Sequence, residues 1–191
     1  MRKRPADHRK RLQRSDEQGQ GHELTFSCYQ GRPLLDDDRR CQHLATAVDR
    51  AVGRHGFSLL AFVFMPNHVH LLVFPEGPSA RISDLLYAIK RPVSFRIKRD
   101  LMATKEPLLE RLVIRERPGK MTFRFWQEGP GYDRNVLGSR ALRTMINYLH
   151  MNPVRCGLVD HPRQWKWSSW RYYAGEPNTP GVELPTIKAL I

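Results

Sequence analysis

The sequence predicts an α+β fold in which antiparallel strands form a sheet with helices on one face. Two apolar runs, 57–64 and 68–74, are separated only by a Pro-Asn turn signal, as in a β-hairpin. Two further segments, 38–54 and 82–101, carry apolar side chains at helical spacing. The order along the chain is strand, helix, paired strands, helix, strand, helix. A ferredoxin-like sheet fits this order best.

The first half of the chain supplies a strand, a helix and the hairpin. Residues 24–29 combine β-branched and aromatic side chains, which suit a half-buried strand. The helix expected over 38–54 begins with acidic residues, and Gly56 is a plausible stop signal at its end. The strand over 57–64 is almost entirely apolar, so we expect it at the centre of the sheet.

The second half is less regular. Pro92 lies inside the helix over 82–101 and is expected to kink or divide it. Residues 103–120 are charged, and the part over 112–115 suits either a short strand or an insertion. Aromatic residues at 123–126 suggest a further strand, which a Gly-Pro-Gly turn closes.

A last helix and an aromatic tail complete the chain. The helix is expected over 139–150 because Leu142, Met145 and Leu149 share one face, and Pro153 should end it. The tail carries tryptophans and tyrosines between cations. Such aromatics can stack on the bases of a single strand, or they can dock on the core, which we favour for most of them. We therefore divide the chain into a flexible basic arm (1–21), one domain (22–160) and a C-terminal tail (161–191).

The charge of the chain points to a polyanionic partner. Lys and Arg number 32 against 19 Asp and Glu, a net charge of +13. No apolar run is long enough to cross a bilayer, and no apolar segment follows the basic N-terminus as in a secretory signal. Nucleic acid is thus the favoured partner and a membrane is not. The candidate DNA contacts are Arg2, Lys3, Arg4, Lys90, Arg91, Arg96, Lys98 and Arg99.

The cysteines indicate a reducing compartment. Cys28, Cys41 and Cys156 are odd in number, far apart and without C-x-x-C spacing, so neither a disulfide framework nor a cysteine zinc site is expected. The cytoplasm is the expected location.

His68 and His70 are the most informative residues. Alternate side chains of a strand point to opposite faces, so the two imidazoles share one face and Val69 turns to the other. Two imidazoles placed in this way can hold one divalent metal ion. The alternative is a pair of core histidines that have merely found hydrogen-bond partners.

The last helix supplies a candidate nucleophile and a further ligand. Tyr148 and Asn152 are four residues apart, hence on the same side of a helix and about 6 Å apart along its axis. The amide oxygen of Asn152 suits Mg²⁺ or Mn²⁺. A phenol beside a metal-bound phosphate can attack phosphorus and form a phosphotyrosine, which keeps the energy of the phosphodiester for rejoining. Each residue alone also has an ordinary structural explanation, as a helix-flank tyrosine and a residue preceding proline.

Three segments closely resemble HUH single-tyrosine transposases, specifically the REP-associated tyrosine transposases of bacteria. They are the histidine segment 65–70, a central signature over 125–127 and 132–135, and the helix-and-tail segment 147–159 continuing to 167–173. The resemblance covers residues 22–173. It implies a ferredoxin-like enzyme of the bacterial nucleoid that nicks single-stranded DNA at or near a hairpin, acting as a monomer or a homodimer.

The resemblance also implies roles for individual residues. Mg²⁺ or Mn²⁺ would bind His68 and His70, Asn152 would be the third ligand, and Tyr148 would form a 5′-phosphotyrosine. Tyr132, which lies in the central signature, is a rival nucleophile. We prefer Tyr148 because a rigid helix positions a nucleophile better than the loop on which we expect Tyr132.

Two other functions compete with this one. The first is a non-catalytic module that binds single-stranded nucleic acid by stacking bases on an open ferredoxin-like sheet. The second is a metal-dependent hydrolase in which water attacks, although no acidic pair lies suitably close to the histidines in the sequence. Neither alternative forms a covalent adduct with DNA.

Overall fold

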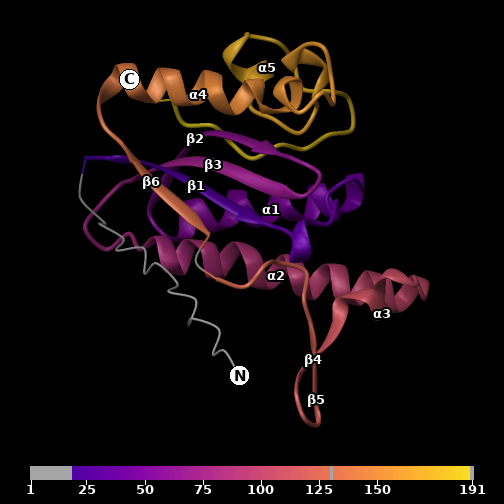
Figure 1. The fold of residues 1–191 in the computed structure, drawn as a ribbon. Coiled ribbons are helices and arrows are strands. Elements are labelled where there is room, and N and C mark those ends of the chain that lie inside the picture. Colours follow the sequence, from indigo (N-terminus) through magenta and orange to yellow (C-terminus); the bar gives the residue numbers. More distant parts are fainter. Residues whose placement is uncertain (1–18, 130, 190–191) are drawn as a thin grey trace, which may run out of the picture.

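The computed structural model describes residues 19–129 and 131–189; Arg2, Lys3 and Arg4 lie outside these ranges. Its main sheet has four antiparallel strands in the order β2-β3-β1-β6 (Figure 1). These are β1 (Gly21–Ser27), β2 (Phe57–Phe64), β3 (His68–Pro75) and β6 (Tyr132–Val136). The α+β class and the ferredoxin-like antiparallel sheet are confirmed.

Helices cover both faces of this sheet, whereas the sequence predicted them on one face only. Helices α1 (Asp38–Arg54) and α2 (Ile82–Thr104) pack on one face, as expected, and share the larger hydrophobic cluster. Helix α4 (Gly138–Arg155) lies on the other face (Figure 1), where a smaller cluster joins it to β2 and β3. None of the helices in the described ranges is long and apolar enough to cross a membrane.

Strand β2 is an edge strand, so the prediction that it is central is wrong. All eight of its residues are buried, because helices cover both of its faces and the C-terminal tail covers its outer edge. Phe64 N donates to Trp167 O at 2.9 Å, and Ser169 N donates to Phe62 O at 3.1 Å. The indole of Trp165 donates to Phe64 O at 2.9 Å. The tail, with short helices η2 (Pro162–Gln164) and α5 (Trp170–Tyr173), is therefore docked on the core.

The fourth strand of the sheet is β6, which the sequence did not indicate. Of the strand expected at 123–126, only Phe123 is in a strand, and that strand is not part of the main sheet. Trp126 makes a single bridge to Cys28 and packs edge-on against Phe26, with ring centroids 5.1 Å apart. Gly131 allows β6 to start close to β1. Its φ is +75°, and a Cβ there would lie 2.4 Å from the carbonyl oxygen of Thr25.

Neither internal proline ends its helix. Helix α2 continues through Pro92 to Thr104, and α4 continues through Pro153 to Arg155. Pro153 has no N–H for the carbonyl of Leu149. The side-chain Nδ2 of Asn152 donates instead, to Leu149 O at 3.3 Å and to Tyr148 O at 2.9 Å. This replacement donor stabilises the last turn of α4.

The charged segment after α2 folds into a separate unit. Helix α3 (Leu108–Leu112) leads into β4 (Val113–Arg117) and β5 (Lys120–Phe123), which pair with each other and not with the main sheet. A short 3₁₀ helix, η1 (Tyr29–Gly31), follows β1. Figure 1 shows the β4–β5 ribbon projecting from the α2 side of the molecule, away from α4.

Candidate active site

The two histidines lie on the α4 face of β3. Val69, Leu71 and Val73 turn to the opposite face and are fully buried in the cluster with α1 and α2. The rings of His68 and His70 are 4.8 Å apart between centroids and nearly perpendicular. The alternation expected from the sequence is therefore realised.

Both imidazoles form a hydrogen bond through their Nδ1 atom. The Nδ1 atom of His68 lies 2.6 Å from Asn67 Oδ1, and Nδ1 of His70 lies 2.8 Å from Glu23 Oε1. Since these oxygens are acceptors, each Nδ1 carries the proton and each Nε2 keeps a lone pair. The pair is thus prepared to bind through Nε2.

Glu23 is a site residue that sequence reasoning missed. It lies on β1, is 4 % exposed, and accepts a hydrogen bond from the Thr25 hydroxyl at 2.6 Å besides the one from His70. Its negative charge lies beside Nδ1 of His70 and favours the binding of a cation at Nε2 of the same ring. The only signal in the sequence is an acidic residue within a predominantly apolar strand, and its meaning depends on the pairing of Thr25 with His70.

His68 is neutral at ordinary pH. Burial, together with repulsion by His70, lowers its pKa to about 4 against the opposing effect of Glu23. A neutral imidazole is the form that binds metal.

Tyr148 lies beside the histidines, at the flank of α4. Its ring is perpendicular to that of His70 with centroids 6.4 Å apart, and 41 % of its surface is exposed. The guanidinium of Arg155, one further residue that sequence reasoning missed, lies 4.8 Å from the Tyr148 ring centroid. A histidine pair and a phenol from distant parts of one chain therefore meet on the same face of the sheet.

Asn152 presents one atom for a ligand. Both hydrogen bonds of its Nδ2 are to carbonyl oxygens, which only accept, so the amide orientation is fixed and Oδ1 remains available. Imidazole nitrogens and an amide oxygen are donor types that a divalent ion such as Mn²⁺ or Mg²⁺ accepts, so His68, His70 and Asn152 are the candidate ligands. No cluster of three His, Cys, Asp or Glu side chains suited to a metal exists within the described ranges.

Tyr132 is the first residue of β6 and not part of a loop, contrary to expectation. Thr25 pairs with Tyr132 on one side and with His70 on the other, so the three side chains form a row on the α4 face. Tyr132 is 51 % exposed. Its position keeps it a rival nucleophile, two strands from the histidines.

A groove between β6 and α4 leads to Tyr148. It has a volume of about 660 Å³, and its lining combines cations and apolar side chains, among them Arg134, Arg140, Val136, Leu137, Met145 and Tyr148. No acidic side chain lines it. A groove of this composition suits the backbone and bases of a single strand.

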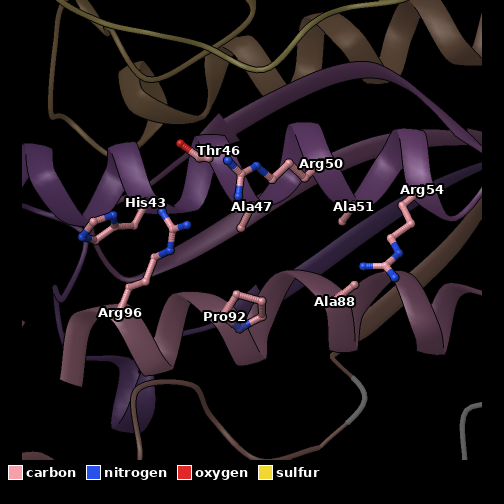
Figure 2. Close-up of a pocket in the computed structure, with 9 residues that line it drawn as sticks. All are labelled: His43, Thr46, Ala47, Arg50, Ala51, Arg54, Ala88, Pro92 and Arg96. Atoms are coloured by element: carbon pink, nitrogen blue, oxygen red, sulfur yellow. The ribbon is translucent and has the colours of Figure 1, made fainter. Parts of the chain in front are cut away.

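The candidate DNA contacts of α2 lie on the opposite side of the sheet from the histidines. Lys90 lies over the Phe26 ring at 4.9 Å, and Arg91 donates to the Tyr87 hydroxyl at 2.7 Å. Arg96 faces a pocket between α1 and α2 together with Arg50 and Arg54 (Figure 2). Lys98 and Arg99 are exposed. The structure therefore does not bring these cations to the histidine site.

Comparison with known proteins identifies the class. The chain belongs to the IS200-like transposases, whose family model matches residues 22–152. It is thus a DNA-processing enzyme of the transposase class. No match was found among curated proteins.

Solved structures support the fold. A REP-associated tyrosine transposase bound to a REP hairpin has 18 % sequence identity and a TM-score of 0.64, over 94 % of each chain. A protein from Deinococcus radiodurans R1, described as a candidate transposase, has 19 % identity and a TM-score of 0.44 over 71 % of this chain and 92 % of that chain. The second similarity is too low to bear on the fold.

Proposed function

We propose that the protein is a metal-dependent single-stranded DNA endonuclease and strand transferase that uses Tyr148 as its nucleophile. The observation that supports this proposal best is the contact of the Tyr148 ring with His70, whose Nδ1 is held by a buried carboxylate. Membership of the transposase family supplies the class of substrate.

In the proposed reaction, the phenol oxygen of Tyr148 loses its proton and forms a bond to the phosphorus of the scissile phosphodiester. The bond from phosphorus to the 3′ oxygen breaks, and that oxygen takes up a proton as the free 3′-hydroxyl. The 5′ end remains attached to Tyr148 as a phosphotyrosine. A second 3′-hydroxyl can reverse the step, so the strand is rejoined without ATP.

The remaining residues position these groups. His68, His70 and Asn152 would hold Mg²⁺ or Mn²⁺, which, when bound, polarises the phosphate and stabilises the charge that develops in the displacement. Arg155 keeps a positive charge against the Tyr148 ring. Glu23 fixes the orientation and tautomer of His70.

A single chain supplies both the histidine pair and the tyrosine of this proposed site. The contact between Tyr148 and His70 is made within a single protomer, so we infer that a monomer is able to cleave. Because the related structure contains a REP hairpin, we propose hairpin or palindromic DNA with a single-stranded flank as the substrate. We place the flank in the groove lined by Arg134 and Arg140. The bacterial cytoplasm, at the nucleoid, is the proposed location.

The two competing functions fit the structure less well. A base-stacking module needs an open sheet, whereas α4 covers the face that carries the histidines. A hydrolase that activates water is usually expected to have further carboxylate or imidazole ligands. Glu23 is instead hydrogen-bonded to the rear nitrogen of His70.

The first experiment incubates the full chain with Mn²⁺ and an end-labelled hairpin oligonucleotide, then looks for a protein–DNA adduct that survives boiling in detergent. Wild type should form the adduct, and Tyr148→Phe should form none while its DNA affinity stays within about twofold, because only the phenol oxygen is removed.

Tyr132→Phe is the matched control and should retain the adduct. The opposite pattern, with the adduct lost only in Tyr132→Phe, would transfer the role of nucleophile to Tyr132. Cleavage without an adduct in wild type would favour the water-using hydrolase.

A further inference from the structure

The β4–β5 ribbon is the most prominent feature that the catalytic proposal leaves without a role. It is a two-stranded antiparallel unit outside the main sheet, and residues 115–121 at its outer end are all exposed. Gly119, with φ +76°, provides the left-handed conformation of its turn. The ribbon projects from the body on the α2 side (Figure 1).

The ribbon is firmly anchored at its base. Leu112 is fully buried in the larger cluster, and Phe123 packs against the same cluster. Arg124 N donates to Leu112 O at 2.7 Å across the base. Two strands that are fixed at one end and exposed at the other form a projection that can enter a groove of a partner.

The charges of the ribbon favour an anionic partner. Residues 113–124 contain one carboxylate, Glu116, and four cations: Arg115, Arg117, Lys120 and Arg124. Lys120 at 2.8 Å and the Thr122 hydroxyl at 2.7 Å, with Arg124 at 3.4 Å, hold the pKa of Glu116 at about 2. Within the described ranges, Arg115 and Arg117 form no ion pair. They are therefore available to an external ligand.

An apolar contact accompanies these cations. Met121 is directly opposite Arg115 in the register of the ribbon and is 61 % exposed. Arginines beside an exposed methionine can contact phosphates and base edges and pack against a thymine methyl at the same time.

We propose that this ribbon binds in the major groove of the double-stranded stem of the DNA hairpin. Paired strands lie about 4.8 Å apart, and the major groove of B-DNA, about 12 Å wide, admits a two-stranded ribbon. The inference rests on the proposed function for the choice of a hairpin as partner. It goes beyond that function by assigning recognition of the stem to residues 115–121.

The position of the ribbon separates recognition from cleavage. The ribbon lies on the α2 side of the sheet, whereas α4 lies on the other side (Figure 1) and carries Tyr148. A stem held by the ribbon must therefore be joined to the scissile phosphate by a single strand that passes around the sheet edge. Strand β6 lies at that edge.

The test uses the full chain with Arg115→Ala and Arg117→Ala combined. Its affinity for a hairpin with a single-stranded flank should fall at least tenfold, whereas its affinity for the flank alone should stay within about twofold. The slope of log K against log salt should decrease by up to about two, one for each lost phosphate contact. Wild type should also protect N7 of stem guanines from dimethyl sulfate, and the variant should not.

Arg50→Ala combined with Arg54→Ala is the matched control, because it removes the same charge from the α1–α2 pocket on the same side of the sheet. It should weaken hairpin binding less than threefold. The inference would be overturned if the ribbon variant kept its hairpin affinity, or if both variants lost hairpin affinity equally. It would also be overturned if the ribbon variant lost affinity equally for the hairpin and for the flank alone, or if wild type left the guanine N7 atoms of the stem unprotected.

Failure of the proposed function has a different signature. If wild type binds the hairpin through the ribbon but forms no adduct, the stem site stands and the tyrosine chemistry falls. If wild type forms the adduct and the ribbon variant binds the hairpin normally, the chemistry stands and the stem site falls.

Discussion

The two faces of the central sheet are made by the same strands and have opposite characters. Toward α1 and α2, β1 and β3 present Leu24, Phe26, Val69 and Leu71, all buried in one hydrophobic cluster. Toward α4, the neighbouring positions of these strands carry Glu23, Thr25 and His70, which are joined by hydrogen bonds, and His68, whose Nδ1 is bonded to Asn67. Substitutions of adjacent residues should therefore separate stability from chemistry.

The largest effect is expected from one substitution on each face of β3. His68→Ala should abolish Mn²⁺-dependent adduct formation while changing the free energy of unfolding by less than about 1 kcal/mol, since the side chain is only half-buried. Leu71→Ala should cost about 2–5 kcal/mol, because it empties a fully buried position. It should leave the adduct rate of the folded fraction near normal. Urea denaturation and the adduct assay measure the two quantities, and normal activity in His68→Ala would reject the metal site.

A smaller effect, on metal affinity, is expected at Glu23, which is hydrogen-bonded to Nδ1 of His70. Glu23→Gln keeps the size of the side chain and an oxygen acceptor for His70 Nδ1, but it removes the negative charge. The affinity for Mn²⁺, measured by calorimetric titration without DNA, should fall about 10- to 100-fold. Glu76→Gln, which changes an exposed carboxylate paired with Lys188, should leave it unchanged. Equal affinities in wild type and Glu23→Gln would show that Glu23 has no influence on the ion.

The smallest effect concerns acid stability on the α4 side. Burial lowers the pKa of His150 to about 4, and its Nε2 lies 2.8 Å from the Ser169 hydroxyl. Because the unfolded chain binds the proton with an ordinary pKa near 6.5, stability should decrease as pH falls from about 6.5 to 4, on the order of 2 kcal/mol.

His150→Gln should reduce this dependence in urea denaturation at pH 7 and pH 4.5 by roughly half, because His68, whose pKa is also lowered to about 4, keeps its own contribution. His55→Gln, at a position that belongs to neither hydrophobic cluster, is the control and should keep it. A wild-type profile that does not change over this range would contradict the assignment.

Periodic apolar patterns predicted most of the fold. The bounds of α1 and β2, at Asp38–Arg54 and Phe57–Phe64, were expected residue by residue, since caps and turn signals delimit them clearly. Strand β6 was missed because it is short, polar and at the edge, where pairing with β1 and the closeness of Gly131 to Thr25 hold it in place. These are tertiary interactions that no local pattern encodes.

For the candidate site, the sequence predicted which side chains lie on a common face. The spacing of His68 and His70 fixes their common face in any strand, and the positions of Tyr148 and Asn152 fix their common side in any helix. Glu23 and Arg155 could not be found in this way, because the role of a single charged residue depends on its contacts in the folded chain, which its position in the sequence does not show. The length of α4 was underestimated because the side chain of Asn152 supplies the donor that Pro153 lacks.

The docking of the tail on β2 has a consequence for synthesis of the protein. Until residues 165–169 have left the ribosome, an eight-residue strand of almost entirely apolar sequence has an open edge. Such an edge is a template for pairing with other copies. Chains that terminate before the tail would thus aggregate during expression, so that a truncated product fails by insolubility before its chemistry can be assayed.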